Sequence, residues 1–172
     1  MHQAPQAERI ELHKWQSAFS SLNEARGILR HIREEAVGHE HPLHHALWAA
    51  FHVFYAKPFK QRPVIRVSRD VVPELSRNIH DAIITLRDKL FAHGDLDGPN
   101  LDQGGLVNSL FVSFHPNQNQ QVVFATRYGF PAPEVVTEYD ELVAALLQTF
   151  HSNAARIFNV WLAKVVSVKF QQ

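Results

Sequence analysis

The chain has 172 residues, 45% of them hydrophobic, with twelve phenylalanines, three tryptophans and no cysteine. This length and composition predict one folded domain over residues 1–172 that buries a substantial core. The absence of cysteine excludes disulfides, thiolate metal sites and cysteine nucleophiles. The 17 basic residues balance the 17 acidic ones, which argues against a protein held on nucleic acid by bulk charge. Residues 1–14 have no signal-peptide pattern and no long uncharged apolar run follows, so we expect a cytoplasmic protein without a membrane segment.

Helical periodicity predicts two long helices in the first third of the chain. The first covers residues 8–37 and stops at Gly38, as glycine commonly ends a helix. The second begins near Pro42, since proline is favoured in a first turn, and is interrupted by Pro58. Two prolines and several basic residues then predict a connecting loop over 57–69.

Two further helices are predicted after this loop. The third covers residues 70–92 and ends at Gly94. Its apolar stripe consists of Leu75, Ile79, Ile83, Leu86 and Leu90. The fourth covers about 133–168, where apolar residues again recur at helical spacing.

Between the third and fourth helices, two short β-type runs at 106–114 and 121–127 flank the turn-forming residues 116–119. This pattern predicts a β-hairpin over about 106–127. The predicted fold class is therefore mainly α: a four-helix bundle with a β-hairpin inserted between the third and fourth helices.

The strongest candidate for a site is the stretch from Arg87 to Asp95, at the predicted end of the third helix. Arg87 is a permanent cation whose planar fork suits a phosphate, and His93 exchanges its proton near neutral pH. Together they suit phosphodiester chemistry without a metal. With Ile79 at 0° on a helical wheel, Arg87 lies at about +80° and His93 at about −40°. A regular helix alone does not bring them to one substrate; a loosened helix end or a second copy of the chain is needed.

A basic segment lies inside this otherwise neutral chain. No Asp or Glu occurs between His41 and Arg69, and five cations fall within thirteen residues: Lys57, Lys60, Arg62, Arg66 and Arg69. Two interpretations stay open, namely contacts to phosphate groups and a solvated loop whose charge is balanced by acids elsewhere in the fold.

The motif resembles the signature of the HEPN superfamily, compact helical-bundle proteins that include toxins of toxin–antitoxin and abortive-infection systems. That signature is an Arg followed by a polar residue and, after four to six intervening residues, a His near the end of the third principal helix. Here five residues separate Arg87 from His93, and Asp88 follows the arginine. The longer form, with Lys89, Ala92 and Asp95, is similar to an abortive-infection (AbiU-like) branch.

The resemblance implies a metal-independent endoribonuclease, without a cofactor, at a composite site in a homodimer. It implies that Arg87 and His93 are catalytic and that Asp88, Lys89 and Asp95 support them. RNA is the implied substrate, with the basic segment contacting its backbone, and an antitoxin protein is a possible partner. The superfamily also includes inactive members, so a catalytically silent RNA- or protein-binding module of the same fold is the alternative.

A third hypothesis is a metal-dependent bundle enzyme. Five of the twelve histidines crowd into one region: His39, His41, His44, His45 and His52. Inward-facing histidines at i, i+4 hold metal ions in some bundles, and His41 and His45 have that spacing. No carboxylate or third histidine has a defined place beside them, so we expect no metal here and interpret the cluster as capping or solvated histidines.

Aromatic side chains form a further group in the second predicted helix: Trp48, Phe51, Phe54 and Tyr55. Such rings stack on nucleic-acid bases in single-strand binders, but their place on an apolar helix favours core packing.

Overall fold

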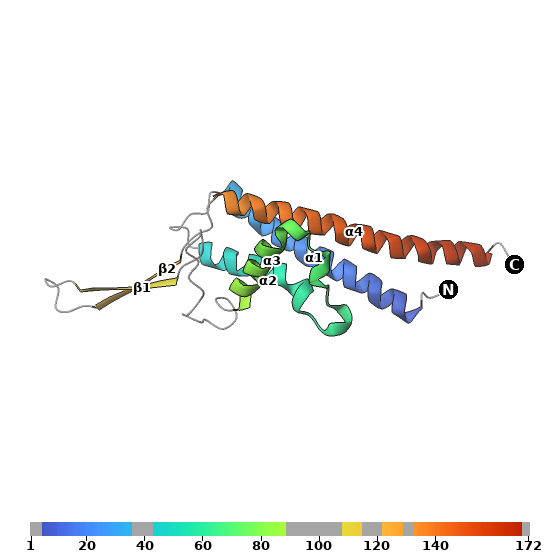
Figure 1. The fold of residues 1–172 in the computed structure, drawn as a ribbon, viewed down its shortest axis with the longest axis horizontal. Coiled ribbons are helices and arrows are strands. Elements are labelled where there is room, and N and C mark those ends of the chain that lie inside the picture. The colour runs from blue at the N-terminus through green and yellow to red at the C-terminus, as the bar shows by residue number, and fades with distance from the viewer. Residues whose placement is uncertain (1–4, 36–42, 89–107, 115–121, 129–132, 170–172) are drawn as a thin grey trace.

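The structure is a computed structural model that describes the backbone of residues 5–35, 43–88, 108–114, 122–128 and 133–169 (Figure 1). In chain order its helices and strands are α1 (Gln6–Glu34), α2 (His44–Lys60), α3 (Arg77–Leu86), β1 (Asn108–Phe114), β2 (Val122–Tyr128) and α4 (Pro133–Lys169). Three short 3-10 turns lie between α2 and α3: Pro63–Ile65, Arg69–Val71 and Glu74–Ser76. The described residues are mainly helical.

Three long helices carry the core. α1 packs along both α2 and α4 and runs antiparallel to each of them (Figure 1). Its buried residues recur at intervals of three or four and form one stripe: Trp15, Ala18, Ser21, Leu22, Ala25, Leu29 and Ile32. The small side chains of Ala18 and Ala25 let the neighbouring helices approach closely, while the larger ones fill the space between them.

Aromatic rings dominate the part of the core that α2 contributes. Trp48, Phe51 and Tyr55 are buried, and the Phe51 ring stacks on that of Tyr139 from α4 with centroids 5.5 Å apart. The rings of Trp15 in α1 and Phe150 in α4 meet at a tilt of 54°, with centroids 5.5 Å apart. The prediction that the α2 aromatics pack in the core is confirmed for these three residues; Phe54 is only partly buried.

The predicted third helix is longer than the helix that the structure has. Residues 70–76 form 3-10 turns, and the α-helix is only Arg77–Leu86. Ser68 accepts a hydrogen bond from the amide of Asp70 and so stabilises a tight turn. Pro73 keeps Val72 extended, with φ −75° and ψ 127°, because the residue before a proline avoids helical backbone. A helix therefore cannot run through this segment, and the four-helix bundle becomes three long helices with a short α3 packed chiefly against α2.

The inserted hairpin is not confirmed as part of this fold. The helical body, 5–35, 43–88 and 133–169, contains no strand among its described residues. Outside it, β1 and β2 have strand backbone and pair antiparallel, with Asn108 opposite Tyr128 and Phe114 opposite Val122. Residues 106–107 and 115–121 of the predicted hairpin lie outside the described part. Because the helical body contains no strand, the predicted fold class, a four-helix bundle with an inserted hairpin, is wrong in that form, and the described residues are mainly helical.

The second helix also differs from the prediction, because Pro58 does not interrupt it. α2 continues to Lys60. Proline costs most in a helix interior, where it removes one amide and crowds the preceding turn; here it stands in the last turn. The carbonyl of Pro58 accepts a hydrogen bond from the amide of Val67 at 3.0 Å, which holds the following segment against the helix. Lys57 and Lys60 are therefore helical residues rather than part of a loop.

The correction to the third helix has a measurable consequence at Leu75. Its side chain was expected in the core stripe, yet it is 97% exposed, whereas Ile83 of the same predicted stripe is fully buried. We expect Leu75→Ala to change the free energy of unfolding by less than about 0.5 kcal/mol and Ile83→Ala to lower it by about 2–5 kcal/mol. Urea denaturation followed by circular dichroism measures both. Equal losses of unfolding free energy would support the predicted continuous helix over 70–92 instead.

Candidate functional site

Arg87 and Asp88 directly follow the last residue of α3. The backbone of these two residues widens into a π-helical turn, and the amide of Arg87 donates to the carbonyls of both Ile83 and Ile84. Shared donors of this kind are common at helix ends, and π-turns frequently mark functional sites. The regular rotation of 100° per residue, on which the predicted wheel position of Arg87 depends, therefore stops at Leu86.

Two cations from different helices converge on one carboxylate at this turn. Lys60 Nζ donates to Asp88 Oδ2 at 2.6 Å, and a terminal nitrogen of Arg87 donates to Asp88 Oδ1 at 2.9 Å. The side chains of Lys60, Arg87 and Asp88 are 41%, 33% and 34% exposed. We call these three residues the Asp88 network. It joins the end of α2 to the end of α3 and carries a net charge of +1.

The electrostatics of the network keep Asp88 ionised. Partial burial, the largest single effect, acts to raise the pKa of its carboxyl group, but the hydrogen bonds and charges of Lys60 and Arg87 together outweigh it. The pKa of Asp88 is therefore lowered from its ordinary value. At neutral pH both nearby cations have an anion as their hydrogen-bond partner.

The five cations of the basic segment divide into paired and unpaired residues. Arg69 forms a two-pronged ion pair with Asp81 of α3, its Nε donating to Oδ1 at 2.8 Å. Lys60 belongs to the Asp88 network, and Arg66 Nε donates to the carbonyl of Gln61 at 3.0 Å. The exposed Lys57 and Arg62 make no ion pair within the described part of the chain. Two of the five charges are thus balanced by acids from α3 and its continuation.

Three of the predicted site residues lie outside the described residues: His93, Lys89 and Asp95. The structure therefore brings together Arg87 and Asp88 from the motif with Lys60 from the basic segment, and it separates Arg69 from them by engaging it with Asp81. The distance between Arg87 and His93 stays a prediction.

Sequence reasoning missed the roles of Asp81 and Asp88 as partners of the basic segment. A signal for them exists: the segment between His41 and Arg69 has no acid, so balancing carboxylates must come from a neighbouring element. Asp81 lies on α3 and Asp88 lies in the turn that directly follows it, so both carboxylates come from the element that packs against α2. The sequence separation of 28 residues between Lys60 and Asp88 hides the pairing from local pattern analysis.

The histidines that the structure describes in α2 are core residues. His44 and His52 are buried, and His52 lies among the rings of Trp48, Phe51 and Tyr139. His52 Nδ1 donates to the carbonyl of Trp48 at 2.8 Å. Within 5–35, 43–88 and the other described ranges, no three ligand-type side chains are grouped to hold a metal ion; His39 and His41, and the side chain of His45, lie outside them.

His52 makes stability depend on pH. Burial lowers its pKa from 6.5 to about 4, and the hydrogen bond to Trp48 only partly offsets this. As the pH falls, the unfolded chain therefore takes up the proton before the folded chain does. The contribution of His52 to the free energy of unfolding is highest above pH 6.5 and decreases as the pH falls toward 4. We expect His52→Leu to reduce the loss of unfolding free energy between pH 7 and pH 4 by about 3 kcal/mol.

Urea denaturation at a series of pH values measures this effect as a slope, which is independent of any constant destabilisation by the substitution. The exposed His31 of α1 supplies the control, since His31→Leu alters neither the core nor the network. An unchanged slope in His52→Leu would contradict a buried neutral imidazole.

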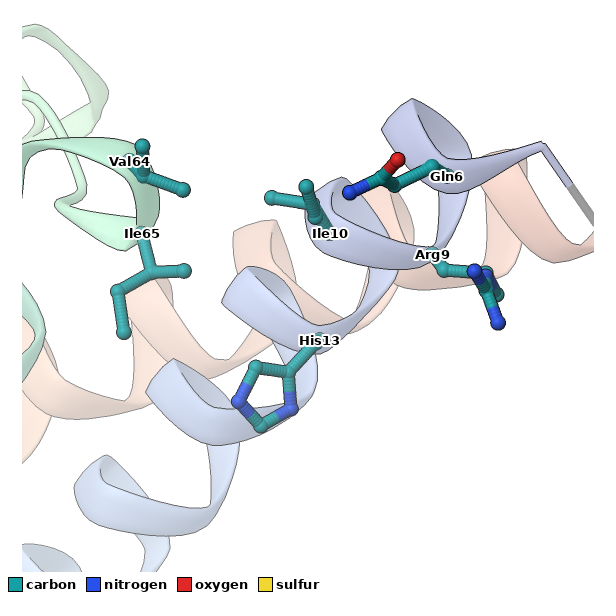
Figure 2. Close-up of a pocket in the computed structure, with 6 residues that line it drawn as sticks. All are labelled: Gln6, Arg9, Ile10, His13, Val64 and Ile65. Atoms are coloured by element: carbon teal, nitrogen blue, oxygen red, sulfur yellow. The ribbon is translucent and has the colours of Figure 1, made fainter.

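A hollow of about 330 Å³ lies between the first turns of α1 and the 3-10 turn Pro63–Ile65. Figure 2 shows the aliphatic side chain of Ile10 on α1 opposite Val64 and Ile65, with Arg9 directed away from them. No predicted site residue lines this hollow. The turn Pro63–Ile65 contacts α1, and the residues that line the hollow do not include those of the Asp88 network.

No helix in the described ranges has both the length and the apolar character required to span a bilayer. Comparison with protein-family models, with curated proteins and with solved structures finds no match to this chain.

Proposed function

We propose that the protein is a metal-independent endoribonuclease that cleaves RNA at a homodimeric site built from Arg87 and His93. The observation that supports this most directly is the Asp88 network, in which Arg87 of the motif and Lys60 of the basic segment stand together and partly exposed. A guanidinium group beside a second cation suits a phosphodiester with developing negative charge. The resemblance of the motif to the HEPN superfamily supports the choice of RNA.

The proposed reaction uses the ribose 2′-hydroxyl as its nucleophile. The imidazole of His93 accepts the proton of this hydroxyl, and the oxygen attacks the adjacent phosphorus. A bond forms between the 2′-oxygen and phosphorus, and the bond to the 5′-oxygen breaks. Arg87 stabilises the charge on the non-bridging oxygens. His93 of the second subunit donates a proton to the leaving 5′-oxygen, so the products are a 2′,3′-cyclic phosphate and a 5′-hydroxyl.

The remaining cations have distinct proposed roles. Lys89 contacts phosphate, and Asp88 and Asp95 orient the catalytic groups. Lys57 and Arg62, which make no ion pair in the described part of the chain, line the path of the RNA backbone together with Lys60 and Arg66. Arg69 contributes least, because Asp81 already neutralises it. A cytoplasmic toxin or abortive-infection effector, held inactive by an antitoxin protein, is the corresponding biological role.

A catalytically silent RNA- or protein-binding module is the second candidate. The hydrogen bond of Arg87 to Asp88 at 2.9 Å favours it, because a neutralised guanidinium contributes less to a transition state. The two candidates share the fold, and the second binds RNA or protein without cleaving RNA.

Incubation of the purified protein with single-stranded RNA in the presence of a chelator tests the proposal. We expect cleavage that survives the chelator, leaves 2′,3′-cyclic phosphate ends and disappears in His93→Ala. If the parent protein and His93→Ala both bound RNA without cleaving it, the silent module would be supported instead. Cleavage abolished by the chelator would overturn the metal-independent mechanism.

A further inference from the structure

We propose that Lys60 and Arg87 form an anion clamp that the Asp88 side chain occupies and that a phosphodiester group of RNA takes over. Asp88 is then an internal competitor that limits the affinity for RNA, besides any orienting role. This inference rests on the proposed function for the choice of RNA as the anion.

The geometry of the Asp88 network is that of a bound anion. Each cation holds a different oxygen of the same carboxylate, Lys60 at Oδ2 and Arg87 at Oδ1. A phosphodiester likewise presents two charged non-bridging oxygens on one atom, and charge-assisted hydrogen bonds to such oxygens are among the strongest that side chains make. The spacing of the two cations thus suits a phosphate as well as a carboxylate.

The charge balance separates this network from the Arg69 pair. Arg69 and Asp81 match one cation with one anion, and both prongs of the guanidinium are used. In the Asp88 network two cations share one carboxylate, which leaves a net charge of +1 to attract a polyanion. Displacement of Asp88 raises this local charge to +2.

The exchange requires little structural change. Asp88 adjoins Arg87 in sequence, and its side chain is one-third exposed, so a rotation of its side chain toward water frees both cations. Ion pairs this exposed contribute little to stability. The backbone of α2 and α3 therefore keeps its position when phosphate replaces the carboxylate.

Binding of a 2′-O-methyl RNA oligomer, measured by fluorescence anisotropy at several salt concentrations, tests the clamp. The methyl group blocks 2′-hydroxyl attack, so binding is observed without cleavage. We expect Asp88→Asn to raise the affinity about 3- to 10-fold, because the cations lose their internal partner. Lys60→Met should lower it by a similar factor and reduce the salt dependence by about one phosphate contact. Lys60→Arg, which keeps the charge but changes the shape of the donor, should bind more tightly than Lys60→Met.

The matched control is Asp140→Asn. Asp140 also has a cation on each carboxylate oxygen, Arg26 at 2.9 Å and Arg33 at 3.6 Å. This substitution therefore changes the net charge by the same amount and frees two cations that belong neither to the motif nor to the basic segment. Equal gains in Asp140→Asn and Asp88→Asn would show that the effect is not specific to Lys60 and Arg87, and would overturn the clamp. An unchanged or reduced affinity of Asp88→Asn for RNA would also overturn the clamp. So would the same gain in affinity when Asp88→Asn is combined with Lys60→Met in a double variant, and so would the absence of RNA binding.

Cleavage of unmodified RNA is measured in parallel, so that the two proposals fail separately. Absence of cleavage with the expected binding pattern refutes the ribonuclease and keeps the clamp. Cleavage that depends on His93, without any response of binding to Asp88→Asn, refutes the clamp and keeps the ribonuclease.

Discussion

Replacing His93 by alanine should lower the rate of RNA cleavage about 10²- to 10⁴-fold, which is the usual contribution of a positioned acid or base. Arg87→Ala should cost about 10²- to 10³-fold, since it removes charge stabilisation from the phosphoryl oxygens. Arg87→Lys keeps the charge but loses the planar fork, so we expect an intermediate rate. Single-turnover cleavage of an end-labelled RNA measures all three.

The control for these variants is Arg30→Ala, because Arg30 is an exposed cation of α1 outside the Asp88 network. It should cleave at the rate of the parent protein. If His93→Ala retained full activity while Arg30→Ala also did, the motif would not be the reaction centre. If the parent protein and all four variants cleaved at the same rate, a contaminating nuclease would be the source of the cleavage.

Phe51→Ala should lower the free energy of unfolding by about 3–5 kcal/mol, the usual cost of removing a buried aromatic ring. Phe51 has no exposed surface and lies between Tyr139 of α4 and the rings of Trp48 and Tyr55 on its own helix. Neighbours fixed on α2 and α4 cannot close the resulting cavity. Because domains are stable by only about 5–15 kcal/mol, this one substitution removes a large part of the total.

Urea denaturation measures the loss. Val53→Ala is the comparison on the same helix, because Val53 is 44% exposed, and it should change stability by less than about 0.5 kcal/mol. A loss below 1 kcal/mol in Phe51→Ala would place the centre of the core elsewhere.

The long amphipathic helices could be predicted from the sequence because their apolar residues recur at helical spacing. The predicted 8–37 and 133–168 correspond closely to Gln6–Glu34 and Pro133–Lys169. The error over 70–76 has a local cause: Leu75 fits the helical stripe by spacing, but Ser68 and Pro73 favour tight turns that spacing does not register. At Pro58 the error was the opposite, because a helix end was predicted where the helix continues. Proline disrupts a helix less when few residues of the helix follow it.

The candidate site was predictable only in its residue types. The Arg87 motif and the basic segment each stand out in the sequence, yet the ion pairs of Lys60 with Asp88 and of Arg69 with Asp81 depend on how α3 lies against α2. That placement follows from the three 3-10 turns, which local periodicity does not reveal.

The length of the connection between α2 and α3 is fixed by contacts to both helices. Near its middle the amide of Val67 donates to the carbonyl of Pro58 in α2, and Arg69 forms an ion pair with Asp81 of α3. Val67 and Val72 are both buried. Because Val67 is bonded to α2 and Arg69 is paired with α3, inserting or deleting one residue between them would break one of these two contacts or shift α3 relative to Lys60. A change in length that most surface connections tolerate should therefore separate Lys60 from Arg87 while the core stays folded.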